Sequence, residues 1–367
     1  MSIEIGFIGF GLIAGSIAKA IKQKHEDYTI YVYNRKHPET PDYLQLAISE
    51  NSIDGVYTSL KDFSNSDLIF LCAPVLTNIS YLKELKDIIK TSCILTDVGS
   101  VKGNIHKAVD DLGLNSHFIG GHPMTGSDRT GYANSSALLM ENAYYLLTPT
   151  AEASEKDILF LKSLVEDMGS ISYIVDCNKH DEITAAISHL PHIIASSLVN
   201  LVHESDDDDE HMKTFAAGGF KDITRIASSS PEMWQSICLS NPDYIVSYID
   251  KFNGKLNDFK EAIISKADKS LYSTFESARD YRNSITSSKP GAIAKVHEIY
   301  VDVPDVPGII AIIATILSSN SVNIKNIGIV HNREFEDGVL RIEFYNEKDS
   351  NEARDALKLY PYKVYDR

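Results

Sequence analysis

A glycine motif near the N-terminus constrains the fold of this chain more than any other feature. The apolar run Ile3–Ile8 is followed directly by GFGLIAG, residues 9–15, and Leu12–Lys24 has the pattern of a helix. A strand, a glycine-rich turn and a helix in this order are typical of a dinucleotide fingerprint. Gly9 permits the tight turn, and Gly11 admits a pyrophosphate at the helix N-terminus. We predict that Gly9, Gly11, Leu12 and Ile13 bind a dinucleotide, with an ordinary tight turn as the alternative.

The residues up to about 150 alternate between strand and helix patterns. Strands are predicted at Tyr28–Tyr33, Asp67–Ala73 and Ser92–Val98, and a helix at Asn78–Lys90. Strands that alternate with helices form βαβ units and a parallel sheet. We expect an α/β Rossmann-type N-terminal domain. The pattern changes after residue 150: a helix at about 154–168 and a short strand at Ile171–Val175 come first, and the chain then turns helical.

The end of the second predicted strand bears on the choice of cofactor. Sites that take NAD usually carry an acid about 20 residues after the glycines, where it bonds the ribose 2′-hydroxyl. Asn34 and Arg35 stand there in this chain. A missing acid beside a cation would tolerate a 2′-phosphate, so the sequence favours NADP over NAD. The alternative is a solvated loop in which Asn34 still bonds a 2′-hydroxyl.

Two motifs that follow predicted strands carry candidate catalytic groups. DVGSVK, residues 97–102, places Ser100 at the carboxyl end of a strand, where ligands of open α/β sheets bind. Ser100 either orients a substrate or nicotinamide there, or merely caps the next helix. GGHPMTGS, residues 120–127, places His122 in a predicted glycine-rich loop after a strand. Histidine suits proton acceptance near neutral pH, so His122 is the candidate general base.

Two further motifs lie in the predicted helical part. SHLPH brings His189 and His192 to one helix face, where a metal is conceivable but no third ligand is obvious, and a core position for either histidine is the alternative. GGFKDITR, residues 218–225, is locally basic, and its Arg225 could hold a carboxylate bidentately. The run HESDDDDEH, residues 203–211, looks like a metal site, but a charge block is usually a solvated loop. We predict no metal site.

The remaining patterns predict a long helix, a linker and a small C-terminal unit. Six apolar residues recur at alternating intervals of four and three, and they predict a helix that packs in a core or at a dimer interface: Ile245, Ile249, Phe252, Leu256, Phe259 and Ile263. A serine-rich stretch with Pro-Gly then predicts a linker. Beyond it, strands are predicted at Val296–Val303, Val322–Val330, Val339–Tyr345 and Tyr362–Tyr365, and helices at Gly308–Ser319 and Asn351–Leu359. Their order is the ferredoxin-like βαββαβ.

Charge and cysteine content exclude several classes of protein. The 51 acidic residues against 35 basic ones give a net charge of −16, which argues against nucleic acid or an anionic membrane as partner. The four cysteines form no CxxC and are interpreted as free thiols of a reducing compartment. The sequence shows no signal-peptide pattern and no uninterrupted apolar run of the ~20 residues that span a bilayer. We expect a soluble cytoplasmic protein.

Five motifs, GFGLIAGS, TDVGSVK, GGHPMTGSDRTG, SHLPH and GGFKDITRIA, occur in this order. With them the chain resembles the prephenate dehydrogenase family in its form with a C-terminal ACT domain, over nearly its whole length. The resemblance implies a dinucleotide-binding Rossmann domain at 1–170, an all-α dimerisation and substrate domain at 171–284, a linker at 285–295 and a ferredoxin-like ACT regulatory domain at 296–367. It also implies a homodimer through the helical domain, which favours the interface for the long helix.

The resemblance implies that prephenate and NAD(P)+ give 4-hydroxyphenylpyruvate, CO2 and NAD(P)H in tyrosine biosynthesis. His122 would accept the proton of the ring hydroxyl, Ser100 would align both groups, and Arg225 would anchor a substrate carboxylate. The same matching assigns the rest of the substrate pocket to His189, His192, Gly218, Asp222, Trp234 and Asp128. It adds Ala73 and Pro74 to the cofactor site.

Departures from the family pattern are few, and alternatives remain. Asn34 replaces the acid of NAD-preferring members, and Asp128 stands where the family often has Glu. An ACT domain implies feedback inhibition by L-tyrosine at Pro307, Gly308 and Asn323, with a purely structural appendage as the alternative. Arogenate dehydrogenase and a 3-hydroxyacid-type dehydrogenase are the alternative activities. SHLPH, GGFKDITR and the C-terminal unit argue against the second.

Overall fold

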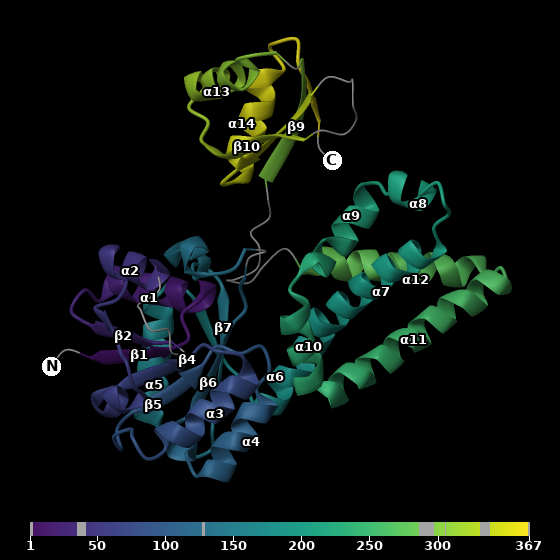
Figure 1. Ribbon diagram of the computed structural model, residues 1–367. Coiled ribbons are helices and arrows are strands. Elements are labelled where there is room, and N and C mark those ends of the chain that lie inside the picture. Colours follow the sequence, from purple (N-terminus) through teal and green to yellow (C-terminus); the bar gives the residue numbers. More distant parts are fainter. Residues whose placement is uncertain are drawn as a thin grey trace. The chain divides into compact units, whose positions relative to one another are not determined.

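The computed structural model describes residues 3–34, 42–126, 129–285, 297–304, 306–330 and 338–365. The chain divides into two compact units, residues 1–271 and 272–367 (Figure 1).

A parallel sheet forms the centre of the first unit. Its strands, in spatial order, are β3 (Gly55–Val56), β2 (Thr29–Tyr33), β1 (Glu4–Ile8), β4 (Leu68–Leu71) and β5 (Ile94–Asp97). A parallel bridge between Leu95 and Phe118 joins β5 to a second sheet of β6 (Ile119–Pro123), β7 (Tyr144–Pro149) and β8 (Ile171–Ile174). The strand order around β1, with crossovers to both sides, confirms the expected Rossmann-type domain.

Helices cover both faces of the sheet, and each face has its own core (Figure 1). On one face pack α1 (Leu12–Lys24), α2 (Asp42–Ser49) and α5 (Glu155–Asp167). On the other pack α3 (Val75–Leu85) and α4 (Gly103–Leu112). Alternate residues of the strands enter the two cores, as Phe70 and Leu71 of β4 do. Burial on both faces explains why these strands are continuously apolar in sequence.

The helix expected at Asn78–Lys90 begins three residues earlier, as α3, and ends at Leu85. Pro74 precedes its first turn, a position that tolerates proline because the missing N–H would have no helical partner. Asn78 therefore lies inside the helix, where its buried side chain bonds back to the preceding loop.

A helical region follows β8 within the first unit. It comprises α6 (Cys177–Thr184), α7 (Leu190–Ser205), α8 (His211–Thr214), α9 (Gly218–Thr224), α10 (Pro231–Ser240) and α11 (Pro242–Ile264). The strand β8 pairs with β7, so residues 171–174 belong to the N-terminal sheet rather than to the helical part, which changes the expected boundary by a few residues. The division into functional domains stays a prediction.

A π-helical turn, Ala185–His189, joins α6 to α7. Pro191 follows it in the second position of α7. Proline has no N–H to give to the carbonyl four residues earlier, so regular α-helical bonding fails at this place and the wider turn accommodates the defect. The motif SHLPH thus marks an irregularity inside a helix, and such turns are frequent at functional sites.

The continuous helix Cys177–Ser205 is long and apolar enough to cross a membrane, by length and composition alone; among the described residues it is the one such helix. A single helix of this kind is weak support for a membrane protein, because helices of soluble proteins pass the same test.

The second unit contains most of one helix, α12, followed by a four-stranded antiparallel sheet with two further helices. Its elements are α12 (Asp268–Ser284, which begins just before the unit), β9 (His297–Val303), α13 (Ile309–Ser319), β10 (Ile324–Val330), β11 (Gly338–Phe344), α14 (Glu347–Leu357) and β12 (Lys363–Tyr365). The order β10-β11-β9-β12 confirms the expected ferredoxin-like βαββαβ arrangement. The helix expected at Asn351–Leu359 begins at Glu347, because Asn346 caps it by accepting from the amide of Asp349.

Candidate active site

The glycine motif forms a turn between β1 and α1 that suits a dinucleotide. Gly9 has φ +86°, and a Cβ there would lie 3.0 Å from the backbone nitrogen of Ala73. Both the backbone conformation and the lack of space therefore disfavour a side chain at this position. At Gly11 no described atom lies within 4 Å of an added Cβ. No side chain of the described residues caps α1, and its first turn carries no acid. These open amide groups and the open space at Gly11 fit a pyrophosphate.

The loop after β4 lies against this turn and is held from inside. Asn78 accepts from the amide of Ala73 at 3.1 Å and donates to the carbonyl oxygens of Ala73 and Leu71. These bonds fix Ala73 and Pro74 at the carboxyl ends of the parallel strands, where the predicted cofactor site lies. Asn78 is a supporting residue that the sequence analysis missed.

Asn34 lies at the end of β2, as expected for a residue near the ribose. Its amide donates to the hydroxyl of Tyr43, which belongs to α2. Arg35 and Asp128 lie outside the described residues.

His122 lies inside strand β6, whereas the sequence predicted a glycine-rich loop after a strand; this expectation was wrong. The glycines before it serve close packing rather than a turn. A Cβ on Gly121 would lie 2.6 Å from the carbonyl oxygen of Asp97, and one on Gly120 would collide with Thr148 Oγ1. Because β5 and β6 are neighbours, Ser100, which follows β5, and His122 lie at the same edge of the sheet.

A buried ion pair fixes β6 beside β5. The Lys102 ammonium pairs with the Asp97 carboxylate and donates to the carbonyl of Gly121 at 2.7 Å. Asp97 accepts in turn from the amides of Gly121 and Gly99. The residue before His122 is therefore bonded through both its backbone groups. Both ends of the motif DVGSVK contribute to this clamp, although the sequence analysis singled out only Ser100.

His122 is connected to the helical region by a direct contact between imidazoles. Its Nδ1 lies 2.8 Å from Nε2 of His180, and Nδ1 of His180 lies 2.8 Å from Oδ1 of Asp181. Burial lowers the pKa of His122 well below its usual value, with smaller contributions from His180, Lys102 and His189. The pKa of His180 is lowered for the same first reason. Both imidazoles are therefore neutral near pH 7, as a general base must be.

His189 and His192 pack around one tryptophan, as the same-face expectation required. Trp234, from α10, stacks on His192 with ring centroids 3.6 Å apart and meets His189 edge-on at 6.1 Å. The buried atoms His189 Nε2 and Trp234 Nε1 have no hydrogen-bond partner among the described residues. Buried polar atoms are normally paired, so these two suit a polar ligand. Burial lowers the pKa of His189 to about 4.

The basic motif lies on α9 and the turn after it. Gly218, Asp222 and Arg225 are all exposed. The Arg225 charge contributes to lowering the pKa of His192, after the larger effect of burial, which places the guanidinium near the His192–Trp234 pair. The structure thus connects Arg225, His192, Trp234 and His189. It shows no comparable contact, within the described ranges, for Gly218 and Asp222.

The acidic side chains around Asp207 form local hydrogen bonds. Asp206 accepts from the amides of Met212 and Lys213 at the start of α8, and Asp207 bonds the imidazole of His211 at 2.7 Å. Among the described residues no group of three or more His, Cys, Asp or Glu side chains could hold a metal ion.

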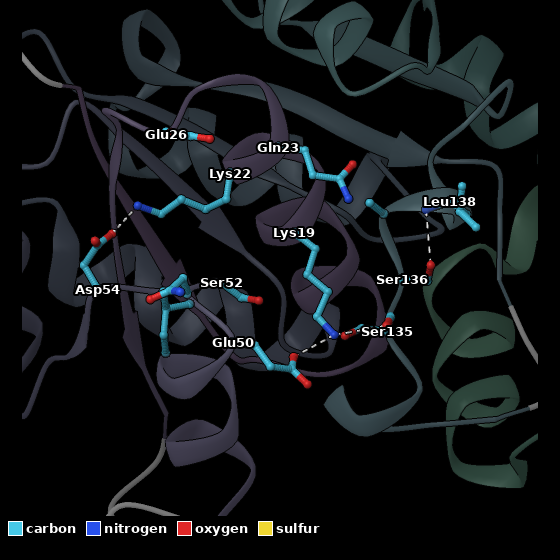
Figure 2. A pocket seen from close by; sticks show the side chains of 13 residues that line it. Lys19, Lys22, Gln23, Glu26, Glu50, Ser52, Asp54, Ser135, Ser136 and Leu138 are labelled. Atoms are coloured by element: carbon cyan, nitrogen blue, oxygen red, sulfur yellow. Dashed lines mark hydrogen bonds and ion pairs between the residues drawn. The ribbon is translucent and has the colours of Figure 1, made fainter.

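One pocket of the first unit, with a volume of about 1040 Å³, lies away from these residues (Figure 2). It is lined by the second half of α1, by residues 50–54, which follow α2, and by residues 135–138. Lys19 pairs with Glu50 at 3.0 Å and Lys22 with Asp54 at 2.7 Å, so its cations are already neutralised. It is not the dinucleotide turn, which lies at the opposite end of α1.

In the second unit, Pro307, Gly308 and Asn323 are exposed. Gly308 stands directly before α13 and has φ +89°, a conformation that glycine adopts readily. Asn323 immediately precedes β10.

Chemically, the first unit combines a dinucleotide turn after β1 with a buried neutral imidazole on β6, both at the carboxyl end of the sheet, with β4 and β5 between them. A base that accepts a proton beside a cofactor that accepts a hydride is the arrangement needed to oxidise an alcohol. The unpaired polar atoms near His189 and the nearby guanidinium suit a polar, anionic substrate.

Comparison with known families gives two adjoining matches. Residues 17–174 match the family described as prephenate dehydrogenase, nucleotide-binding domain, and residues 176–277 match prephenate dehydrogenase, dimerization domain.

Individual proteins are similar over larger parts of the chain. Prephenate dehydrogenase of Bacillus subtilis (strain 168) is 36% identical over 98% of this chain and 96% of its own length. The crystal structure of Aquifex aeolicus prephenate dehydrogenase with hydroxyphenyl propionate and NAD+ has TM-score 0.72 and 31% identity, over 78% of this chain and 99% of that one. Synechocystis arogenate dehydrogenase has TM-score 0.68 and 26% identity, over 77% of this chain and 99% of that one.

Proposed function

The chain belongs to the prephenate dehydrogenase family, and from this premise we propose that it oxidises prephenate to 4-hydroxyphenylpyruvate and CO2 with a nicotinamide dinucleotide. The observation that carries the proposal is the buried His122, held on β6 at the carboxyl edge of the sheet that also carries the dinucleotide turn, with a pKa that burial lowers. The match over 98% of the chain supports the same activity.

The roles of the residues follow from the chemistry of the substrate. Prephenate has a ring hydroxyl, a ring carboxylate and a pyruvyl side chain. His122 takes the hydroxyl proton, and Ser100 aligns the hydroxyl with the imidazole. A dinucleotide held at the turn of Gly9 and Gly11 would supply the acceptor for the hydride that leaves the same carbon. Loss of the ring carboxylate as CO2 makes the ring aromatic and drives the step. Arg225 anchors a substrate carboxylate, near the stacked His192 and Trp234.

Replacing His122 tests the proposed mechanism. We expect His122→Ala to lower kcat by at least ~10²-fold, the low end for general-base catalysis, while dinucleotide binding is kept. NAD(P)H formation from prephenate at 340 nm is the measurement, and dinucleotide-dependent quenching of Trp234 fluorescence is the control. Near-wild-type turnover of this variant would contradict the assignment.

Arogenate is the alternative substrate, in which an amino group replaces the side-chain keto oxygen. The structural likeness to Synechocystis arogenate dehydrogenase favours including it. Initial rates with prephenate and arogenate at equal concentration decide between them. We expect prephenate to be the better substrate, and absence of NAD(P)H formation from prephenate would overturn the proposed function.

For the cofactor we propose NADP+ as the preferred dinucleotide, on the strength of Asn34 and Arg35 in place of the acid. The ratio of kcat/KM for NADP+ and NAD+ measures the preference. Asn34→Asp should lower that ratio, because a carboxylate bonds the 2′-hydroxyl and repels a 2′-phosphate. A wild-type ratio well below one would show that Asn34 serves an NAD site.

We further propose a homodimer through the helical region. Of the six apolar stripe residues on α11, only Ile245 is buried within the chain, whereas Leu256 and Ile263 are 51% and 61% exposed. An uncovered apolar face of this kind suits a second copy of the chain. Light scattering should give a dimer for the wild type and for Lys255→Glu, and a monomer for Leu256→Glu. A dimeric Leu256→Glu variant would place the interface elsewhere.

For the second unit we propose an ACT domain that binds L-tyrosine and inhibits the enzyme. The βαββαβ order and the exposed Pro307, Gly308 and Asn323 support the assignment. Tyrosine should lower the initial rate, and Asn323→Ala should raise the half-inhibitory concentration at least tenfold. Full activity of the wild type at millimolar tyrosine would leave the unit a structural appendage.

We also propose a cytoplasmic enzyme. The apolar helix Cys177–Ser205 carries His180 and Asp181, which bond to the Rossmann-type domain, and this fits a helix of a globular protein.

A further inference from the structure

Three side chains form a hydrogen-bonded line that leads away from the candidate base. His122 on β6 contacts His180 at 2.8 Å, and His180 contacts its neighbour Asp181 at 2.8 Å. His180 is completely buried and Asp181 is 4% exposed. We propose that His180 and Asp181 are positioning residues for the reaction, and that this His–His–Asp line (His122, His180, Asp181) fixes the tautomer of His122 so that its Nε2 accepts the substrate proton. The inference rests on the proposed function.

The bonding partners determine where each proton lies. The Asp181 carboxylate is held as an acceptor, because Oδ1 accepts from the amide of Lys102 at 2.8 Å and Oδ2 from the amide of Gly103 at 2.7 Å. An ionised carboxylate can only accept, so Nδ1 of His180 must donate to it. In neutral His180 the other nitrogen, Nε2, is then an acceptor, and Nδ1 of His122 donates to it. Nε2 of His122 is left with its lone pair.

The anchor of the line is rigid. Asp181 caps the N-terminus of α4, where the helix dipole favours a negative charge. Asn241 donates to the main-chain carbonyl of Asp181 at 2.9 Å and so fixes the backbone as well. The loop that carries Ser100 leads directly into α4. The Asp181 carboxylate therefore has two effects: it fixes the tautomer of His122 through His180, and it holds the end of the Ser100 loop.

The line also stabilises the charge that forms in the reaction. When the O–H bond of the substrate breaks and the proton joins Nε2, His122 becomes a buried cation. The groups that face it from other elements are His180 on α6, His189 in the π-helical turn and Lys102 after β5, and each of them lowers its pKa. The hydrogen bond through His180 to the Asp181 anion offsets this cost, as a carboxylate does in other hydrogen-bonded catalytic arrays.

Three variants separate positioning from folding. His180→Ala removes the acceptor, and we expect kcat to fall at least ~10²-fold with KM changed less than about threefold. His180→Gln places a carbonyl oxygen where Nε2 was and should restore most of this loss. Asp181→Asn offers an N–H₂ group that permits the reversed line, with a proton on Nε2 of His122, and kcat should again fall.

Two readouts move only if the line acts through His122. Without the Asp181 charge, the protonated His122 is less stable, so in Asp181→Asn the acid limb of the kcat–pH profile should shift to lower pH by at least half a unit in the residual activity. Nitrogen-15 NMR of the histidines in the full-length enzyme should show Nδ1 of His122 protonated and Nε2 unprotonated, and a mixture in His180→Ala.

The outcomes are distinguishable. A wild type that shows the Nδ1–H tautomer but does not oxidise prephenate would contradict the proposed function and leave the line intact. An active wild type with kcat of His180→Ala within threefold, or with an Nε2-protonated His122, would overturn the line. Since Asp181 also caps α4, circular dichroism and dinucleotide binding are measured for each variant. If Asp181→Asn does not fold, the His180→Ala and His180→Gln pair carries the test.

Discussion

At the residue scale, the buried ion pair of Asp97 and Lys102 positions a neighbouring strand rather than adding to the stability of the fold. Both side chains are fully buried, and removing two charges from water costs several kcal/mol per ion. Their attraction, the amides of Gly99 and Gly121 and the carbonyl of Gly121 offset this cost. Because the pair bonds both backbone groups of the residue before His122, its effect is to hold the candidate base in place.

The same scale applies to Arg225, whose proposed role is binding. A charged hydrogen-bonded pair contributes about 1.5–3 kcal/mol, which corresponds to roughly 10- to 100-fold in affinity. We expect Arg225→Ala to raise KM for prephenate by this factor, with a smaller change in kcat. Steady-state kinetics measure it, and Lys221→Ala, an exposed cation in the same motif, is the control. An unchanged KM for Arg225→Ala would remove the anchor role.

At the element scale, strand β6 depends on its glycines for contact with β5. A Cβ on Gly121 meets the backbone of Asp97, whereas one on Gly120 meets the side chain of Thr148. We expect Gly121→Ala to destabilise the first unit and to displace His122, because the clash with the Asp97 backbone cannot be removed by a substitution. We expect Thr148→Ala to restore part of the stability lost in Gly120→Ala, because it removes the side chain that the new Cβ meets.

Urea unfolding of the three single variants and of the two double variants with Thr148→Ala, together with their kcat values, provides the measurement. The expected order of stability places Gly121→Ala below the double variant Gly120→Ala/Thr148→Ala, and Thr148→Ala should not rescue Gly121→Ala. Equal stability of Gly121→Ala and the wild type would show that β6 can move away from β5 at no cost.

The helices and strands could be predicted from the sequence where a local pattern determines them, and their ends were predicted less accurately. The turn at Gly9 and the helix Leu12–Lys24 were predicted as found, because a positive φ and a 3.6-residue period are local properties. The start of α3, the π-helical turn and the strand conformation of His122 were missed. They depend on a buried Asn78, on the missing N–H of Pro191 and on close packing against Asp97, none of which a periodic pattern reveals.

At the scale of the whole first unit, three buried histidines link folding to pH. Their pKa values are lowered on folding, so below about pH 6.5 the unfolded chain binds more protons than the folded one. Stability is then fully present above the unfolded pKa and is lost as the pH falls, for His189 down to about 4. The slope is ~1.4 kcal/mol per pH unit for each histidine.

We therefore expect the urea midpoint to fall steeply between pH 7 and pH 5. His189→Gln does not titrate in this range, so its midpoint should fall less steeply than that of the wild type. Parallel pH dependences of the two proteins would show that His189 is not kept neutral by folding.

The candidate site was predictable in its parts but not in its connections. His122, His192, Trp234 and Arg225 were expected, and the structure places the last three together. His180, Asp181 and Asn241 were missed, because NKHDE and the lone asparagine carry no motif of their own. The placement of β8 in the N-terminal sheet was likewise visible only from its pairing with β7.

By itself, the sequence determined the order of the strands and helices, the dinucleotide turn and the motifs that identify the family, because each depends on residues close together in the chain. Only the tertiary structure decided which groups meet. His122 and His180 are 58 positions apart, and Asp181 caps a helix 78 positions away. Such contacts arise when separate elements bury their apolar faces against one another, and burial then sets the proton positions that the proposed chemistry uses.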